Sequence, residues 1–454
     1  MKVVYLNTLY PPHVRGGAEL ILQGQAQAMA RRGHEVTVLT IGPQRAPRRT
    51  EELRDGVRVV RAGFRNRYFH QAGHQAGAAP AAFERLRWHW RDRHNAPMGR
   101  EARELLESLR PDVVCCHNLA GWSITVWQAV RSLGLPLVQV LHDQYLLCPT
   151  AMMFRGGGVC ERACLRCRLL RLRHARASAQ VDAVVGVSRY VLEKLLGAGY
   201  FAAAATREVL YNSAAEVLPS APMPMPMPMP MPMPMPMPMP TRAPRRTGRP
   251  ASTADPMRFG FIGTLAPCKG IEPLLRAVAD FGGNELELWV AGRGEPAYER
   301  QLRARFEGRR IRFLGQVPPA DFFADIDVCV VPSLWHDTLP SVVFEALGFG
   351  VPVIGARRGG IPEMIRDGYN GLLFEPDVPG ALGGRLRCFI EQPALQGALA
   401  ANCRASAAPF HDLPRWLERH EAILCAAIDT ARARAQVRGA LAPDVATGTL
   451  PCEG

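Results

Sequence analysis

A run of alternating proline and methionine from Pro222 to Pro240 is the feature that most constrains this chain. Proline at every second position removes every second backbone donor, and its ring is incompatible with a helix interior or a central strand. We therefore expect residues 216–256 to form an extended linker. It separates an amino-terminal domain (1–215) from a carboxyl-terminal domain (257–410).

On both sides of this linker, short apolar runs rich in β-branched residues alternate with amphipathic segments. The predicted strands are 3–6, 35–39, 57–61, 113–116, 137–140 and 183–187, then 258–262, 285–291, 311–314, 328–331 and 352–354. The predicted helices include 18–32, 100–108, 126–133, 271–281, 299–306, 341–347 and 361–366. This alternation predicts two α/β domains with parallel, doubly wound, Rossmann-like sheets. Ligands of such sheets bind beyond the carboxyl ends of the strands, which predicts a cleft between the domains.

The carboxyl-terminal end of the sequence is expected to behave differently from the two domains. Residues 411–433 read as a helix that carries Trp416, and we expect this helix to return to the amino-terminal domain and brace it. Residues 434–454 read as a flexible tail.

Composition limits the compartment and the class of protein. Of the 454 residues, 48% are hydrophobic and 21% are charged, which is typical of a globular protein. No apolar run reaches the ~18 residues that a membrane-spanning helix needs. The opening run from Met1 to Leu6 reads as a first strand, not as a signal peptide. We therefore expect a cytoplasmic protein.

The formal charge of +14 has two interpretations. The chain has only three lysines, so arginine supplies nearly all of the positive charge. We find no zinc-finger, helix-turn-helix or RNP pattern, and no nucleic-acid partner is expected. One arginine cluster contains Arg162, Arg166, Arg168, Arg171, Arg173 and Arg176, with Glu161 as its only acid. It is either a peripheral contact with an anionic membrane, at the inner face, or a solvated surface.

Three segments carry chemistry. Gly16 and Gly17 follow the first strand and open a helix, where backbone N–H groups can approach an anion. Lys269 lies in the loop after the first strand of the second domain, where it can meet a phosphate. Asp337 precedes a helix, and Glu345 lies within that otherwise apolar helix, where a ligand hydroxyl pair is a natural partner for its carboxylate.

These segments resemble the signature of the retaining glycosyltransferase family 4, which has the GT-B fold. The matching stretches are Asp337 with Glu345 seven residues further on, Gly359–Glu363, Asp367–Phe374, Gly16–Glu19 and Gly263–Gly270. The resemblance covers most of both domains.

The resemblance implies a nucleotide-diphosphate sugar as donor. Glu345 would hold the ribose hydroxyls, and Lys269 would neutralise the diphosphate. Asp337, with the backbone of Thr338 and Leu339, would hold the transferred sugar. No cofactor or metal would be required for the transfer, because cationic side chains and helix N-termini stabilise the charge.

Two histidines and one arginine complete the expected site. His117 matches the family's active-site histidine, and His142 ends the next strand as a second catalytic candidate. Thr264 stands where the family usually has an arginine, and Arg293 is the candidate to replace that contact with the donor.

A cysteine-containing insertion is expected over residues 143–176. Cys148, Cys160, Cys164 and Cys167 could form a structural tetrahedral zinc site. The alternative is four reduced thiols in a mobile insertion. The insertion lies on the acceptor side and is expected to influence acceptor choice.

The resemblance therefore implies a retaining glycosyltransferase that acts on a glycan or lipid-linked acceptor in surface polysaccharide or glycolipid synthesis. Three alternatives remain open. A nucleotide-sugar epimerase or phosphorylase can share the fold, a degenerate sugar-nucleotide binder could have lost catalysis, and a basic membrane or nucleic-acid protein would not need Glu345.

Overall fold

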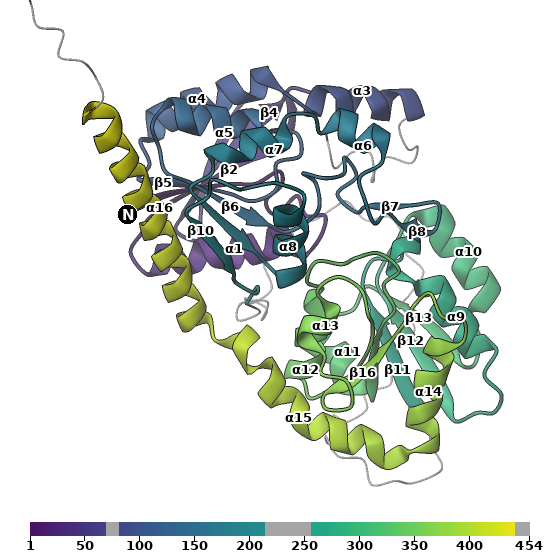
Figure 1. Ribbon diagram of the computed structural model, residues 1–454. Helices are drawn as coiled ribbons and strands as arrows, with labels where there is room; N and C mark the ends of the chain where they lie inside the picture. The colour runs from purple at the N-terminus through teal and green to yellow at the C-terminus, as the bar shows by residue number, and fades with distance from the viewer. Residues whose placement is uncertain (70–80, 214–255, 441–454) are drawn as a thin grey trace, which may run out of the picture.

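A computed structural model describes residues 1–69, 81–213 and 256–440. The chain forms two α/β halves, one above the other, and a long helix runs along one side of the upper half (Figure 1). The proline–methionine run and the predicted linker as far as residue 255 lie outside the described residues.

An eight-stranded sheet forms the centre of the amino-terminal half. Its strands, in spatial order, are β10 (Thr206–Val209), β9 (Ala183–Gly186), β6 (Leu137–Leu141), β5 (Val113–Cys116), β1 (Lys2–Leu6), β2 (Glu35–Arg45), β4 (Val57–Phe64) and β3 (Thr50–Arg54). Neighbouring strands are parallel, except that β3 runs antiparallel to β4 at one edge. β5 and β6 are buried along their whole length, as expected where helices cover both faces of a parallel sheet.

The helices of this half lie on both faces of the sheet, with α16 along its side (Figure 1). They are α1 (Gly17–Arg31), α3 (Ala82–Asp92), α4 (Ala96–Leu109), α5 (Thr125–Ser132), α6 (Leu165–Leu170), α7 (His174–Ala177) and α8 (Arg189–Gly197). A short hairpin, β7 (Phe154–Arg155) with β8 (Gly158–Val159), and the helices α6 and α7 form the predicted insertion.

The carboxyl-terminal half contains a six-stranded parallel sheet. Its order is β13 (Ile311–Gly315), β12 (Leu286–Ala291), β11 (Met257–Ile262), β14 (Val328–Val331), β15 (Val353–Ala356) and β16 (Gly371–Phe374). Its helices are α9 (Ile271–Ala279), α10 (Pro296–Phe306), α11 (Pro319–Asp325), α12 (Ser341–Gly348), α13 (Ile361–Met364) and α14 (Ala381–Glu391).

Each sheet reverses its strand order at one point. In the first sheet the reversal lies between β1 and β5, and in the second it lies between β11 and β14. Loops after such strands diverge to opposite faces and leave room for a ligand at the carboxyl edge. The topology therefore predicts that the loops after β1, β5, β11 and β14 form the ligand site.

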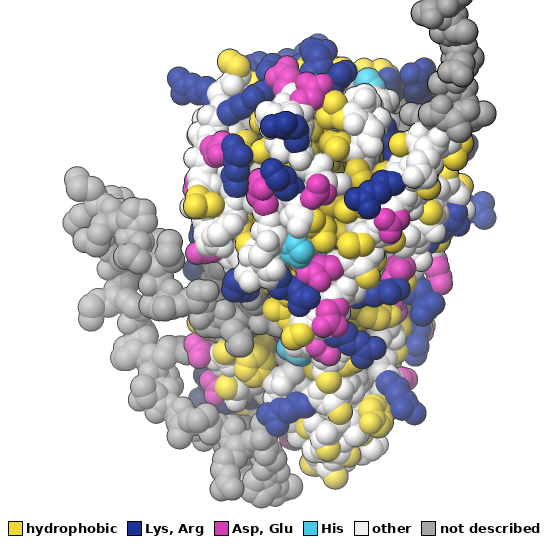
Figure 2. Space-filling model, turned by 90° about the vertical axis from the view of Figure 1, so that its left-hand side faces the viewer, with side chains coloured by type: hydrophobic (Ala, Val, Ile, Leu, Met, Phe, Trp, Pro, Cys, Tyr) yellow, Lys and Arg dark blue, Asp and Glu magenta, His cyan; other side chains and the backbone are white. Residues whose placement is uncertain are grey.

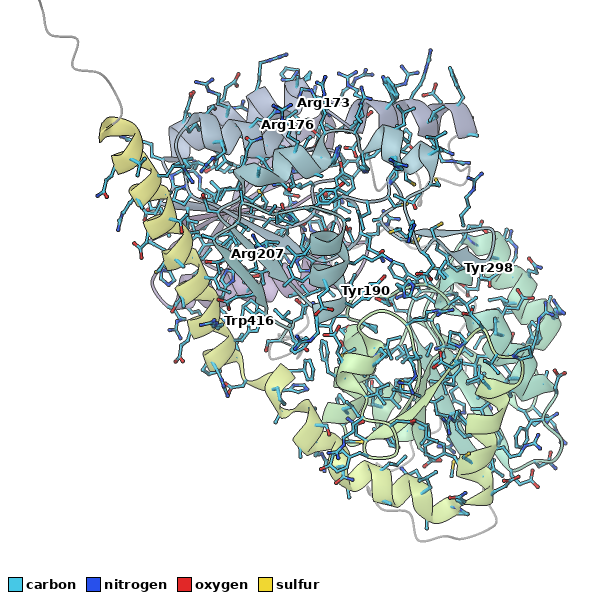
Figure 3. All side chains as sticks on the ribbon, in the orientation of Figure 1. Arg173, Arg176, Tyr190, Arg207, Tyr298 and Trp416 are labelled. Carbon is cyan, nitrogen blue, oxygen red and sulfur yellow. The ribbon has the colours of Figure 1, made fainter. Side chains whose placement is uncertain are left out.

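Two long helices return the chain to the first half. α15 (Pro393–His411) packs on α12, and α16 (Leu413–Ala440) packs on α1 and on the first sheet. In Figure 3, Trp416 lies on the part of α16 beside the first half, and its indole N–H donates to the carbonyl oxygen of Tyr211 (2.8 Å).

The structure corrects the predicted start of the flexible tail. α16 continues to Ala440, so residues 434–440 of the predicted 434–454 tail are helical. The salt bridge from Arg434 to Asp182 ties this extension to the first half. Among the described residues, none of the helices has the length and apolar character needed to cross a membrane.

Candidate functional site

Two histidines meet at the carboxyl edge of the first sheet. His117 follows β5 and His142 follows β6, and these parallel strands are neighbours. His117 Nδ1 and His142 Nε2 share a hydrogen bond of 2.8 Å, and the rings stack with their centres 5.0 Å apart. The backbone N–H of His117 donates to the carbonyl oxygen of Leu6 at the end of β1 (2.8 Å), which fixes the first ring beside the switch point.

Burial keeps both histidines neutral. It lowers the pKa of His117 well below its usual range, and the neighbouring His142 adds to this shift. Burial lowers the pKa of His142 to about 4. A pair of neutral imidazoles can share one hydrogen bond, since one ring donates and the other accepts. The pair can offer a hydrogen bond to a reacting group at neutral pH, but it brings no positive charge.

A lysine and a carboxylate meet at the switch point of the second sheet. Lys269 ends the short 3₁₀ helix Pro267–Lys269 after β11, and Asp337 lies in the loop between β14 and α12. Lys269 Nζ is 2.5 Å from Asp337 Oδ2 and lies 5.2 Å from the centre of the Trp335 ring. The sequence motifs placed these two residues in separate loops, and the fold brings them into one ion pair.

Two glycines hold the Asp337 loop against the following segment. A Cβ on Gly359 would lie 1.9 Å from the carbonyl oxygen of Asp337, and its φ is +54°. Gly360 N–H donates to the same oxygen (2.8 Å). Only glycine permits this close backbone approach, which explains the Gly359–Gly360 pair in the motif.

The two sheets contribute to a single site because the halves touch through these loops. Thr338 Oγ1 donates to the carbonyl oxygen of His142 (2.6 Å), and Gln144 Nε2 donates to the carbonyl oxygen of His336 (3.1 Å). Thr338 is buried, as is Leu339 beside it. The histidine pair and the Asp337 loop are therefore neighbours across the junction.

Two helix N-termini approach the same junction. Gly17 opens α1 after Gly16, and a Cβ on Gly17 would lie 3.9 Å from Ser341 Oγ, at the start of α12. The helix dipole favours an anion at each terminus, and at α1 the Glu19 carboxylate already accepts the Gly16 N–H (2.9 Å). The arrangement can bind a diphosphate between α1, α12 and Lys269.

Glu345 lies in α12, one turn from Ser341. Burial raises the pKa of its carboxyl group, and a hydrogen bond with the Ser341 side chain lowers it in part. The carboxylate is only half-buried and can accept hydrogen bonds from a ligand.

Arg293 follows β12 but has another partner. Its guanidinium donates to Glu299 Oε1 on α10 (3.0 Å), and its side chain is 65% exposed. No contact among the described residues joins Arg293 to Lys269 or Asp337, so the structure does not place this predicted donor residue beside them.

The four cysteines of the insertion are free thiols. Cys148 Sγ lies 3.7 Å from Cys167 Sγ. Within 1–69, 81–213 and 256–440, no three histidine, cysteine or acidic side chains are grouped so that they could hold a metal ion. The structure therefore does not assemble Cys148, Cys160, Cys164 and Cys167 into the zinc site that their spacing allows.

Sequence reasoning gave no role to Glu363, which joins the two halves. From α13 its carboxylate accepts the N–H groups of Arg189 and Tyr190, at the start of α8, at 2.8 Å each. The hydroxyl of Tyr211 donates to the same carboxylate (3.0 Å). Figure 3 shows Tyr190 at this junction. The sequence does mark Glu363, because this residue ends the Gly359–Glu363 motif. The motif does not predict its contact with α8, because α8 belongs to the other half.

A second missed carboxylate is Asp143, which directly follows His142. Its Oδ1 accepts the N–H of Tyr145 (2.8 Å). Burial raises the pKa of Asp143 to about 6, and Glu19 and Arg15 from the start of α1 act on it electrostatically. It lies on the amino-terminal side of the junction.

Two protein-family models match this chain. The model described as "Glycosyl transferases group 1" matches residues 256–392, and the "Glycosyl transferase 4-like domain" matches residues 16–212. Each match corresponds to one half of the structure and contains the switch-point loop of that half.

Curated relatives match over different lengths. A Klebsiella pneumoniae protein named as an uncharacterized 42.6 kDa protein in the cps region is 26% identical over 366 residues, which are 81% of this chain and 88% of that protein. D-inositol 3-phosphate glycosyltransferase of Streptomyces scabiei is 32% identical over 181 residues, which are 36% of this chain and 40% of that enzyme. This chain therefore spans less than half of the inositol phosphate enzyme.

Solved structures share the whole fold. The Anabaena protein HepE in complex with UDP has a TM-score of 0.60 and 18% identity, over 97% of this chain and 100% of that one. Sucrose-phosphate synthase from Thermosynechococcus elongatus has a TM-score of 0.64 and 17% identity, over 97% and 99%. WaaG, a glycosyltransferase involved in lipopolysaccharide biosynthesis, has a TM-score of 0.60 and 16% identity, over 93% and 99%. The predicted two-domain GT-B fold is confirmed.

Proposed function

Since the chain belongs to the group 1 glycosyltransferases and is a glycosyltransferase, we propose that it transfers a sugar from a nucleotide-diphosphate donor with retention of configuration. The proposed acceptor is a glycan or a lipid-linked saccharide in surface polysaccharide synthesis. We also propose that the protein is cytoplasmic.

One observation carries the proposal: the hydrogen bond from Thr338 to His142 joins the switch-point loops of the two sheets. It sets the histidine pair beside the Lys269–Asp337 ion pair. A donor bound at the second sheet would therefore present its sugar to the histidines of the first sheet.

The donor site would use the groups already at the junction. A diphosphate would take Lys269 as its cation, with the N-termini of α1 and α12 facing its oxygens. Glu345 would accept hydrogen bonds from the ribose hydroxyls. Asp337 and the backbone of Thr338 and Leu339 would hold the transferred sugar. That HepE was solved with UDP supports a nucleotide donor.

The transfer step follows from this placement. The nucleoside diphosphate leaves the anomeric carbon, the acceptor oxygen forms the new bond on the same face of the sugar, and the proton of the acceptor hydroxyl passes to the leaving diphosphate oxygen. The neutral His117–His142 pair can offer a hydrogen bond to the sugar. Asp143 would accept a hydrogen bond from the hydroxyl group of the acceptor. The cps-region relative and WaaG support polysaccharide synthesis as the setting.

The test is donor binding by the wild type and by Glu345→Gln, measured by thermal shift and calorimetry with UDP-, GDP-, ADP- and dTDP-sugars. One donor should raise the melting temperature of the wild type, since a ligand that binds only the folded state stabilises it. Glu345→Gln should bind that donor at least about tenfold more weakly, the loss expected for an unpaired hydroxyl contact.

Glu391→Gln, on the exposed end of α14, is the matched control and should bind like the wild type. Equal binding by Glu345→Gln would remove this donor site. Binding of a donor without transfer to any acceptor would favour the degenerate binder instead.

A further inference from the structure

Helix α3 carries an apolar stripe that faces solvent. Phe83, Leu86 and Trp90 are 59%, 40% and 51% exposed, at the i, i+3, i+7 spacing of one helix face. The opposite side of α3 already packs on the protein, because Trp88 and Asp92 are buried. The stripe is therefore not needed for the packing of α3.

The insertion repeats this pattern. Leu165, Leu169 and Leu172 are 82%, 51% and 56% exposed, and they lie on or just after α6 at the spacing i, i+4, i+7. Leu170, between them, is buried and anchors the segment. Two neighbouring segments thus each bury one face and expose an apolar face.

The two segments form one surface, here called the α3–α6 surface and defined as residues 81–94 with 161–176. Figure 1 shows α3 and α6 side by side at the top of the first half. Arg171 Nη2 lies 4.0 Å from Asp92 Oδ2 at the end of α3, and its Nε donates to the carbonyl oxygen of Tyr145 (2.7 Å). Burial lowers the pKa of His89 on α3, and the positive charge of Arg166 on α6 lowers it further.

Exposed arginines surround both stripes. They are Arg85, Arg87, Arg91, Arg162, Arg166, Arg168, Arg173 and Arg176. Figure 3 shows Arg173 and Arg176 at the top of the same half. Arg87 lies 4.3 Å from the centre of the Phe83 ring, so charge and apolar surface are intermixed.

Few acids balance these arginines. In the two segments Asp92 is buried, Glu84 bonds to Arg67 at 2.9 Å and lies 4.0 Å from Arg87, and Glu161 lies 4.0 Å from Lys194. The face along which α16 runs differs, since basic and acidic side chains are mixed over it (Figure 2). The α3–α6 surface is thus strongly basic as well as apolar.

We propose that the α3–α6 surface docks on an anionic lipid membrane, with its aromatic and leucine side chains in the headgroup region and its arginines on the lipid phosphates. Apolar stripes flanked by arginine on surface helices are the features that bind such an interface. The proposal extends the arginine cluster of the insertion to a second helix and supplies the apolar part that the cluster lacked. It does not rest on the proposed transfer reaction.

The test is co-sedimentation of the full chain with vesicles at ~0.1 M salt, where charges within about 10 Å still interact. Vesicles of phosphatidylglycerol and phosphatidylcholine should bind the wild type, whereas phosphatidylcholine alone should not. Two triple variants, Phe83→Ser/Leu86→Ser/Trp90→Ser and Arg166→Glu/Arg168→Glu/Arg173→Glu, should each lower the partition coefficient by at least about tenfold.

The control is Leu53→Ser/Val378→Ser, which removes side chains that are 78% and 55% exposed elsewhere. It should bind vesicles like the wild type. The arginine variant changes only exposed side chains and keeps the test valid if the apolar variant does not fold.

Three results would overturn the proposal. They are equal binding to neutral and anionic vesicles, an equal loss in the control, and no vesicle binding by the wild type. In the last case, a wild-type dimer that the apolar variant dissociates in analytical ultracentrifugation would assign the stripe to a second copy of the chain.

Discussion

His420 shows how a single residue can couple the stability of this protein to pH. It lies on α16, buried against the first sheet, with Nε2 3.1 Å from the hydroxyl of Tyr5 and 2.7 Å from Nε2 of Gln25. Burial lowers its pKa from 6.5 to about 4. In the folded state it therefore stays neutral where the unfolded chain takes up a proton.

Replacing His420 by glutamine should weaken the dependence of stability on pH. Between pH 6.5 and 4 the unfolded state binds more protons than the folded state, so the free energy of unfolding of the wild type falls as the pH falls. His420→Gln should lack about 3 kcal/mol of this fall, at ~1.4 kcal/mol per pH unit. Urea unfolding at several pH values measures both slopes, and parallel curves would contradict the assignment.

At the residue scale, the role of a side chain can be predicted from the sequence only when the residues that it contacts are close to it in the sequence. Asp337 and Glu345 are candidates from the local pattern of strand, loop and helix in which they stand, and Thr338 is a candidate from the family resemblance. Glu363 and His420 are not, because their partners lie in the other half or on a strand far away in the sequence.

At the scale of helices and strands, the apolar runs predicted the sheet centres well. The strands at 113–116 and 328–331 are confirmed residue by residue. The edge strands β3 and β10 were missed, since their exposed polar residues do not read as a buried run. Helix α10 begins at Pro296, three residues before the predicted 299. The missed signals were proline in the first turn and Glu295, which accepts the N–H groups of Ala297 and Tyr298.

Glu363→Gln should weaken the contact between α13 and α8. The charged carboxylate at the helix N-terminus contributes about 1.4 kcal/mol, so its loss should shift the equilibrium towards separated halves by roughly tenfold. Small-angle scattering should then report a larger radius of gyration, and transfer should slow.

Two variants make this experiment specific. Glu363→Asp keeps the charge and should recover part of the compact form. Glu375→Gln, an exposed carboxylate in the same half that pairs with Arg357, should scatter like the wild type. A wild-type radius for Glu363→Gln would mean that this contact does not hold the halves together.

At the scale of the whole molecule, the first half depends on residues distant in the sequence. The first half is completed by α16, whose Ile423, Leu424 and Ala427 are buried in its core. The sequence predicted a bracing helix over 411–433, but its full extent to Ala440 follows from packing that no local pattern records.

Leu424→Ala should therefore destabilise the amino-terminal half, although Leu424 follows the other half in the sequence. A buried leucine truncated to alanine costs ~2–5 kcal/mol. Hydrogen exchange should accelerate in peptides of β5, β6 and β9 and stay unchanged in β11 and β12. Val437→Ala, exposed on the same helix, is the control. Equal acceleration in both halves would show that they unfold as one unit.

The described part of the first half ends close to the point where the chain returns to that half. Ser213, the last described residue before the linker, donates from Oγ to the carbonyl oxygen of Phe410 (3.2 Å), just before the chain returns through Asp412. A hinge at this contact would open the junction while Ser213 and Phe410 stay together.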